Sequence, residues 1–392
     1  MSLKSIKLKK KTLLTAVITA VISVFISFIA FYLIFLSGGR YLKLKQLDFL
    51  VENFFYGEID TSEINDMIIR GYVAGLNDKY ARYYTVEETN ARADDLDGKG
   101  QGIGVIISKH PDNENIFIKN VYEGAPADKA GIKEGDQIIA IDGVTTEELT
   151  YSGAVDAMLK PIGEKIKATV LRDGQTFDVE ITCSAFAAQT VFPKVIEDYG
   201  YIKITAFNAG TPQQFEKAVN QLTLDGVKAL IFDLRSNGGG TVDDVCKMID
   251  FLCPYGDIMS VKYANGNTRV TEISDKGEIN LPMVVLTNGS TASAAEMFTA
   301  SIKDFGKGIS MGEKTYGKGV MQRTYKFTDG SSVVFTIAEI FSHSGSSFNG
   351  KGIEPDVKIN LTEEQIRFNY TASAEQDLYV QAALEYLKNN EN

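Results

Sequence analysis

Ser293 stands at a point in the chain where a serine could act as a nucleophile. The segment TNGSTASAAEMF leads from an expected strand at 283–286 into an expected helix, and Ser293 falls at the start of that helix. The free N–H groups and the positive dipole end of a helix N-terminus stabilise an oxyanion that forms beside such a serine. The alternative is structural, since Ser290, Thr291 or Ser293 can cap the helix while Glu296 completes a capping box. The pattern leaves both interpretations open.

A nucleophilic serine needs a base, and Lys318 is the candidate because the chain has only two histidines. A lysine accepts a proton near neutral pH when burial lowers its pKa and leaves part of it as a neutral amine. Lys318 lies between Gly317 and Gly319, in a loop after the strand that follows the Ser293 helix. Glycines let this backbone come close to other elements, which can bury the amine. The alternative is a lysine that is simply solvated at the surface.

Two other motifs compete with this pair. GEKTYGKG (312–319) nearly matches the phosphate-binding loop GxxxxGK[ST], but it ends in glycine and is followed by an expected strand where a helix is needed. GISMG matches the GxSxG elbow of hydrolases, with Ser310 as nucleophile and His343 as a base further along the chain. Because no helix is expected after Ser310, we interpret it as an ordinary strand residue.

Strands that alternate with helices from about residue 191 onward must position these residues. The apolar runs YIKITAF, ALIFDLR and MVVLTNG are typical of buried strands, and helical segments separate them. Strands joined by crossover helices form a parallel or mixed sheet, and sites lie at the carboxyl ends of its strands. DLRSNGGG (Asp233–Gly240) ends one strand in consecutive glycines, which could supply a backbone donor there.

The chain before residue 191 has two different patterns. Residues 41–95 carry apolar residues at helical spacing and are expected to be helical. The following region is rich in glycine and short strands, one of them at Ile103–Ile107, with turns at Asp142-Gly143 and Asp173-Gly174.

The N-terminus has the features of a membrane anchor. Thr12 to Leu36 is an uncharged run of 25 residues, and about 20 apolar residues suffice for a helix to cross a bilayer. The preceding lysines should stay in the cytoplasm, which places the rest of the chain outside it. A cleaved signal peptide is the alternative, but no convincing small-x-small cleavage site follows, so a retained signal anchor is favoured.

Composition excludes several classes of protein. The net charge is −11 although residues 1–45 contain eight basic and no acidic residues, so the body of the chain is acidic and unsuited to nucleic acid. Cys183, Cys246 and Cys253 have no CxxC spacing, which excludes a disulfide scaffold and gives no metal-site pattern. We expect neither a metal nor a cofactor.

Taken in order, the motifs resemble those of the carboxyl-terminal processing peptidases, which are serine proteases with a Ser–Lys dyad and a PDZ domain. The similarity runs from about Leu76 to Leu361. It covers the segments LNDKYARYYT, GIGV, GAPADKAGIKEGDQIIAIDG, DLRSNGGG, STASAAE, GEKTYGKGVMQ and GKGIEPDV. Their order and the 25-residue gap from Ser293 to Lys318 make the set specific.

The resemblance implies roles for five residues of the catalytic core. Ser293 would be the nucleophile and Lys318 the general base. Gln322 would orient the lysine through its amide oxygen. The oxyanion donors would be the backbone amides of Ala294 and Gly239.

The resemblance also implies peptide capture by the PDZ domain. Its carboxylate-binding loop and edge strand correspond to Gly102, Ile103, Gly104 and Val105. Successive backbone N–H groups there would receive a peptide's terminal carboxylate, and the strand edge would pair with the peptide. Ile106 and Ile132 are expected to receive the last side chain of the peptide. Arg172 could connect this domain to the catalytic core.

We therefore predict a multidomain protein of α/β and α+β class with five parts. These are a cytoplasmic tail with a transmembrane signal anchor (1–40), a helical region (41–95), a β-rich PDZ domain (96–186), an α/β peptidase core with a mixed sheet (187–361) and a C-terminal helical region (362–392).

The predicted function is that of a membrane-anchored serine endopeptidase, exposed outside a bacterial cell, which recognises free and unstructured C-termini of proteins. The helical regions at both ends suggest a homodimer. The rival hypotheses are an inactive PDZ-type peptide receptor and an esterase that uses Ser310 and His343.

Overall fold

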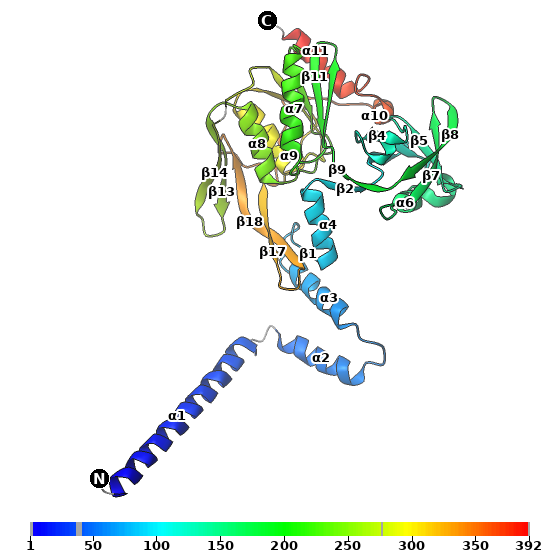
Figure 1. The fold of residues 1–392 in the computed structure, drawn as a ribbon. Coiled ribbons are helices and arrows are strands. Elements are labelled where there is room, and N and C mark those ends of the chain that lie inside the picture. Colours follow the sequence, from blue (N-terminus) through cyan, green and yellow to red (C-terminus); the bar gives the residue numbers. More distant parts are fainter. Residues whose placement is uncertain (1–2, 37–40, 276, 391–392) are drawn as a thin grey trace. The chain divides into compact units, whose positions relative to one another are not determined.

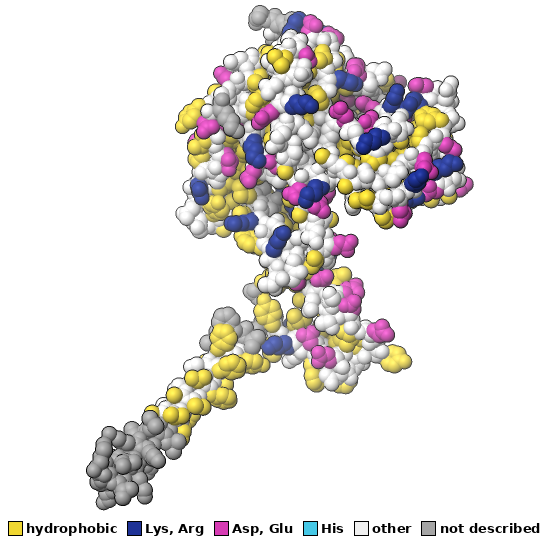
Figure 2. Space-filling view, viewed as in Figure 1, with side chains coloured by type: hydrophobic (Ala, Val, Ile, Leu, Met, Phe, Trp, Pro, Cys, Tyr) yellow, Lys and Arg dark blue, Asp and Glu magenta, His cyan; other side chains and the backbone are white. Residues whose placement is uncertain are grey.

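The computed structural model describes residues 3–36, 41–275 and 277–390. The chain divides into two compact units, Met1–Met67 and Ile68–Asn392, which are described separately (Figure 1). In the first unit, α1 (Leu3–Leu36) contains the stretch Thr15–Tyr32, which has a mean hydropathy of 2.2 and is not buried. Figure 2 shows hydrophobic side chains around the described part of α1. This helix is long and apolar enough to cross a membrane.

The region expected to be helical contains three helices and one strand. The helices are α2 (Leu42–Phe54), α3 (Thr61–Ala74) and α4 (Val86–Leu96). The expectation that residues 41–95 are all helical is wrong at β1 (Arg82–Tyr84). This strand pairs antiparallel with β18 (Ser332–Ser342). Tyr83 of β1 is buried, so this short segment is held by a sheet partner about 250 residues away rather than by its local pattern.

The β-rich domain that follows is built on an antiparallel sheet with the order β3-β4-β5-β7-β8, in which β6 pairs with β5. Isoleucine and valine side chains from these strands form its core together with α5 and α6. Asp142-Gly143 and Asp173-Gly174 have positive φ at both positions, as tight hairpin turns require. The elements are β3 (Val105–Lys109), β4 (Ile116–Val121), α5 (Pro126–Lys129), β5 (Gln137–Ile141), β6 (Val144–Thr145), α6 (Thr146–Met158), β7 (Lys165–Arg172) and β8 (Gln175–Thr182).

The strand expected at Ile103–Ile107 is interrupted. The backbone turns at Gly102 and Gly104, whose φ angles are 117° and 78°. The segment before the turn, β2 (Lys99–Gly102), pairs with β9 (Ser184–Ala187), while the segment after it becomes β3. The turn leaves the GIGV segment at the edge of the β-rich sheet.

A mixed six-stranded sheet with the order β10-β11-β12-β15-β16-β19 forms the centre of the peptidase core. β10 and β11 are antiparallel and the remaining neighbours are parallel, as the alternation of strands and helices predicts. The strands are β10 (Val191–Ile196), β11 (Tyr199–Ile204), β12 (Leu230–Asp233), β15 (Met283–Thr287), β16 (Gly308–Gly312) and β19 (Val357–Lys358).

Helices cover both faces of this sheet. Phe232 and Val285 pack with α7 (Thr211–Leu224), α8 (Val242–Leu252) and α9 (Ala294–Asp304), which lie together in Figure 1. Neighbouring strand residues such as Ile231 and Val284 point the other way, toward α11 (Leu378–Asn389). Because both faces are buried, the strands are continuous apolar runs.

A second sheet in the core joins β1 to β18, β13 and β14, with β17 also paired to β18. The hairpin of β13 (Gly256–Tyr263) and β14 (Thr268–Ser274) was not among the expected strands, whereas β17 (Val320–Lys326) was. The C-terminal region adds α10 (Glu363–Thr371) before α11. Three loops that follow β12, β15 and β16 meet at the carboxyl edge of the central sheet, and they carry the candidate site.

Candidate active site

Ser293 lies at the end of the loop between β15 and α9, with its backbone in an unusual conformation. Its φ and ψ are 59° and −119°, which is a rare combination for a residue with a side chain. Such strain persists where the surrounding structure holds it, and it is frequent at functional sites. The strand–turn–helix setting places the Ser293 side chain at the N-terminus of α9, beside the first helical residue, Ala294.

The loop after β12 lies directly against Ser293. A side chain at Gly239 would place its Cβ only 2.8 Å from the Ser293 Cβ and 3.0 Å from the Ala294 nitrogen, so only glycine fits. Asn237 fixes this approach, because its carbonyl oxygen accepts a hydrogen bond from the Ala292 amide at 2.9 Å. The Asn237 Nδ2 group also donates to the Ile204 carbonyl at 2.9 Å.

One expected oxyanion donor is occupied in this structure. The Gly239 amide donates to Asn237 Oδ1 at 2.8 Å, so it does not point freely to the space beside Ser293. Asn237 thereby satisfies a buried amide that would otherwise have no acceptor. Gly239 lies beside Ser293 as an oxyanion donor must, and that role for its amide stays a prediction.

Glu296 connects the loops that carry Ser293 and Lys318. Its carboxylate is fully buried, and one oxygen, Oε2, accepts from the Ser293 amide at 3.0 Å and from the Lys318 amide at 2.7 Å. The other oxygen, Oε1, accepts from the Gly317 amide at 2.7 Å and from the Thr315 hydroxyl at 2.6 Å. Because two amides reach one oxygen atom, the backbones of Ser293 and Lys318 lie side by side.

Sequence reasoning had given Glu296 only the role of a helix-cap partner. The signal for a larger role is an acidic residue among small and apolar residues in SAAEMF, since a buried carboxylate must find donors. Thr315 was not identified from the sequence. It supports Glu296 and also accepts from the Ile353 amide at 2.7 Å.

Lys318 is held in a compressed loop, as its flanking glycines predicted. A Cβ at Gly317 would lie 2.8 Å from the Gly352 nitrogen, and one at Gly319 would lie 2.6 Å from the Asn349 nitrogen. The Lys318 Nζ lies 4.9 Å from the centre of the Tyr80 ring. Burial lowers the pKa of the Lys318 amine below its ordinary value, and the positive charge of Arg92 lowers it further.

Gln322 does not make the contact that was expected of it. It lies on β17, where its Nε2 group donates to the Val320 carbonyl of the same strand at 2.9 Å. The Lys318 amine lies over Tyr80 instead. The hydrogen bond to Val320 uses the NH2 group of the Gln322 amide and not its oxygen, so an orienting role for Gln322 through the oxygen stays a prediction.

Ser310 and His343 have separate partners. Ser310 is a buried residue of β16, and its hydroxyl and amide both donate to Asp356, at 3.2 and 2.8 Å. The His343 Nδ1 atom lies 2.8 Å from the Asp257 carbonyl oxygen, and the ring stacks on Phe305. β17 follows the GEKTYGKG segment, so the strand-to-helix geometry of a phosphate loop is not formed there.

Comparisons with known proteins match two regions of the chain. A model of peptidase family S41 matches residues 198–359, and a PDZ domain model matches residues 94–171. The chain is 30% identical over 367 residues to the "Carboxy-terminal processing protease CtpA" of Bacillus subtilis, which covers 92% of this chain and 78% of the relative. It is 31% identical over 362 residues to the "Probable CtpA-like serine protease" of Staphylococcus aureus strain N315, with 90% and 72% covered.

The chain belongs to the carboxy-terminal processing protease family. It is therefore an S41 peptidase with a PDZ domain. A solved structure whose name describes an S41 protease, from Bacteroides fragilis, has the same fold, with a TM-score of 0.63 at 18% identity. The superposition covers 86% of this chain and 93% of that one.

A cavity of about 740 Å³ lies next to the GIGV segment, and residues of the PDZ domain, of α4 and of the start of the peptidase core line it. Gly102, Ile103, Gly104 and Val105 are among them, as expected. The apolar side chains of the PDZ domain that line it include Ile107, Val155, Met158, Leu159 and Ile162.

Three expectations for the PDZ domain were wrong. Ile132 is buried in the domain core, and Ile106 is not among the cavity residues, because strand side chains alternate and Val105 and Ile107 face it instead. Arg172 does not reach the peptidase core. It binds Asp136 through two hydrogen bonds of 2.6 Å, since that buried carboxylate lies beside it in the same domain.

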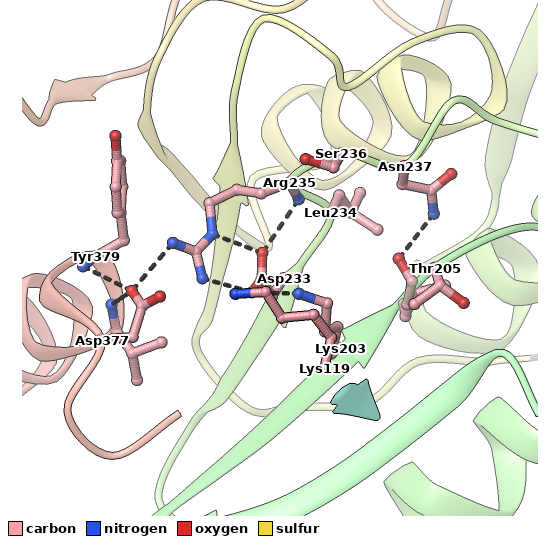
Figure 3. Close-up of polar contacts among 12 residues, drawn as sticks. Lys119, Lys203, Thr205, Asp233, Leu234, Arg235, Ser236, Asn237, Asp377 and Tyr379 are labelled. Carbon is pink, nitrogen blue, oxygen red and sulfur yellow. Dashed lines mark hydrogen bonds and ion pairs between the residues drawn. The ribbon is translucent and has the colours of Figure 1, made fainter. Parts of the chain in front are cut away.

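A buried ion network supports the loop after β12 of the S41 core. Figure 3 shows Arg235 between Asp233 and Asp377, with shortest N–O distances of 2.6 and 3.0 Å. The Tyr201 hydroxyl donates to Asp233 at 2.8 Å. Burial alone would raise the pKa of Asp233, but the charges of Arg235 and Lys203 hold it below its ordinary value. The network therefore keeps an ionised carboxylate at the base of the glycine loop.

Proposed function

We propose that this chain is a membrane-anchored serine endopeptidase that binds unstructured protein C-termini at its PDZ domain and cleaves with Ser293 and Lys318. One observation carries the proposal. The buried Glu296 carboxylate binds the backbone amides of Ser293 and Lys318 through a single oxygen atom. A strained serine and a lysine of lowered pKa are thereby kept in neighbouring loops.

The chemistry would proceed through an acyl-enzyme. The Ser293 oxygen forms a bond to the carbonyl carbon of the substrate while its proton passes to the neutral Lys318 amine. The Ala294 amide stabilises the oxyanion, and the Gly239 amide joins it when it leaves the Asn237 side chain. The lysine then gives its proton to the leaving amine as the C–N bond breaks. A water molecule then attacks the acyl-serine ester and gives a proton to Lys318. Lys318 returns this proton to the Ser293 oxygen as the ester C–O bond breaks, which releases the peptide carboxyl product and restores the serine.

Substrates would be selected by their C-termini. The terminal carboxylate would be bound by backbone amides of the Gly102–Val105 segment, and the peptide would pair with the edge strand β3. The cavity beside this segment is lined by leucine, isoleucine, valine and methionine side chains, which favours an apolar last residue.

The anchor and the oligomer are part of the same proposal. The uncharged stretch of α1 would hold the enzyme at the outer face of the membrane, where its substrates meet it by confinement to a surface. α2 exposes Leu47, Leu50 and Phe54, which could pack against a second copy of the chain.

The test is labelling of the detergent-solubilised full chain with a serine-reactive phosphonate, followed by mass spectrometry. We expect modification of Ser293 in the wild type, none in Ser293→Ala and strongly reduced labelling in Lys318→Ala. Labelling at Ser310 would support the esterase hypothesis instead. A chain that binds C-terminal peptides but neither reacts nor cleaves would be a receptor.

A further inference from the structure

The segment between α3 and β2 contacts the loop of the proposed base. The Tyr80 ring centre lies 4.9 Å from the Lys318 Nζ and 4.7 Å from the Lys79 Nζ. Arg92, on α4, lies with its guanidinium 5.3 Å from the centre of the Tyr84 ring. A lysine amine over an aromatic face is attracted by the negative face of the ring, which favours one position for a flexible side chain.

This segment is fixed to the peptidase core at three points. Asp78 accepts hydrogen bonds from the Thr336 amide at 2.8 Å and hydroxyl at 3.2 Å. β1 pairs with β18, and the hydroxyls of Thr89 and Ser332 lie 2.8 Å apart. Tyr80 is therefore presented to Lys318 by a framework that is part of the sheet, not by a free loop.

The contact of Tyr80 with Lys318 is made by the ring. The Tyr80 hydroxyl and the Arg92 Nε atom are buried without a hydrogen-bond partner among the residues that the structure describes. A buried polar atom without a partner costs free energy. The contact between Tyr80 and Lys318 therefore uses the ring face and not the hydroxyl.

Charged groups from every neighbouring element face the Lys318 amine. Arg92 of α4 and Lys79 of the preceding turn disfavour the ammonium form, while Asp78 and Glu296 favour it. The two carboxylates are already engaged, Asp78 with Thr336 and Glu296 with four donors. Their remaining capacity to stabilise an ammonium group is therefore reduced.

We propose that Tyr80 is a positioning residue for Lys318 and acts through its ring face. The inference rests on the proposed function, because it assigns this role toward a catalytic lysine. It makes the segment that precedes the PDZ domain a part of the catalytic apparatus.

Tyr80 is tested by comparing Tyr80→Leu with Tyr80→Phe in the full chain, using a flexible protein substrate. Tyr80→Leu should lower kcat by about 10- to 100-fold at every pH with little change in KM, because the base is misplaced. Tyr80→Phe keeps the ring and should recover most of that loss. Tyr255→Leu, which removes a highly exposed tyrosine elsewhere, is the control and should match the wild type. Equal kcat values in Tyr80→Leu and Tyr80→Phe would overturn the role of the ring.

The same assays separate failure of this inference from failure of the proposed function. Ser293→Ala and Lys318→Ala are measured beside the other variants. If either still cleaves at the wild-type rate, the dyad is wrong and the inference is overturned with it. If both are inactive while Tyr80→Leu behaves as the wild type, only the present inference is overturned.

Discussion

At the scale of single residues, Lys318 combines a long flexible side chain with surroundings that restrict it. Its amine contacts an aromatic ring, and its loop is compressed between Glu296 and the 349–352 segment. Burial removes hydration from the ammonium form, and the neutral Gln322 cannot restore the lost charge. The proton affinity of this amine is therefore the property on which the proposed chemistry depends.

The pH–rate profile of the full chain should show this property. Since the pKa of Lys318 is lowered, activity should rise with pH to a midpoint well below the value of about 10.4 for a free lysine. Lys318→Arg keeps the charge but should be inactive, because a guanidinium does not give up its proton in this range. Neither Lys318→Arg nor Lys318→Ala should add to the loss in Ser293→Ala. A fully active Lys318→Arg enzyme would mean that the lysine acts only as a positive charge.

Glu296 should be needed for both stability and activity. Glu296→Gln leaves one acceptor oxygen for four donors and places an NH2 group against some of them. Each buried donor that loses its acceptor costs about 1–3 kcal/mol, so the unfolding midpoint should fall and kcat should drop with it. Urea unfolding and turnover are measured beside Glu385→Gln, which removes an exposed carboxylate. Unchanged values for both quantities would show that Glu296 does not organise the two loops.

At the scale of elements, the site depends on how closely the loop after β12 approaches the start of α9. Gly239 is required there because a Cβ would lie 2.8 Å from the Ser293 Cβ, whereas a Cβ at Gly238 meets no atom within 4 Å. The φ angle of Gly239, 102°, is also unfavourable for any other residue. A side chain added at Gly239 would therefore clash with Ser293, whereas one added at the neighbouring Gly238 would not.

This difference gives a matched pair of substitutions. Gly239→Ala should push Ser293 out of place and lower kcat by about 100-fold or more, since displacement of a catalytic group by about 1 Å has this effect. Gly238→Ala should keep most of the activity. Both variants should keep binding to C-terminal peptides, measured by fluorescence anisotropy in the full chain. If Gly238→Ala were as inactive as Gly239→Ala, loop flexibility and not close packing would explain the requirement.

The elements that could be predicted from the sequence are those whose signal is local. β12 and β15 are apolar runs, and the helices between the strands have apolar residues at helical spacing. Ser293 could therefore be placed in the loop after β15, and Lys318 in the loop after the next strand, β16. β1 could not be predicted, because RYY becomes a strand only through β18. The same limit applies to the contact between Tyr80 and Lys318, since 238 positions separate them and neither residue has a local pattern that points to the other.

The hydrogen-bond and ion-pair partners of individual side chains were the hardest feature to predict from the sequence. Gln322 and Gly239 lie where the resemblance predicts, but the first donates to Val320 and the second to Asn237. The sequence leaves a link from Arg172 to the catalytic core open, but in the structure Arg172 pairs with Asp136 inside the PDZ domain. A buried acid with an available cation nearby forms its ion pair locally, and a sequence does not show which acids are buried.

At the scale of the whole molecule, the C-terminal region contacts both the PDZ domain and the peptidase core. Arg367 of α10 pairs with Asp112, and the Tyr370 carbonyl oxygen accepts from Lys119 of β4. Burial and the nearby charge of Lys203 lower the pKa of Lys119 to about 8. Further along, Asp377 caps α11 and binds Arg235 at the base of the glycine loop (Figure 3). One segment of chain thus contacts both the PDZ domain and the loop after β12.

Peptide capture and catalysis should nevertheless be separable, because they use different residues. A Cβ at Gly104 would lie 2.3 Å from the Ala125 Cβ, so Gly104→Ala should distort the carboxylate loop. Gly131→Ala is the matched control, since Gly131 has a similar φ of 83° but no atom within 4 Å of its Cβ position. In the full chain carrying Ser293→Ala, Gly104→Ala should weaken binding of a labelled peptide with an apolar free C-terminus by about tenfold, which corresponds to about 1.4 kcal/mol.

The effect of Gly104→Ala on activity depends on whether binding of the C-terminus stabilises only the enzyme–substrate complex or also the transition state relative to it. With Ser293 restored, Gly104→Ala should raise KM for a substrate with a free C-terminus while kcat at saturation stays near that of Gly131→Ala, because loss of uniform binding affects KM alone. Amidation of the substrate's C-terminus should produce the same rise in KM in the wild type and little further rise in Gly104→Ala, since both changes remove one interaction. A fall in kcat in Gly104→Ala that is absent in Gly131→Ala would show that the occupied PDZ loop also activates the site of Ser293.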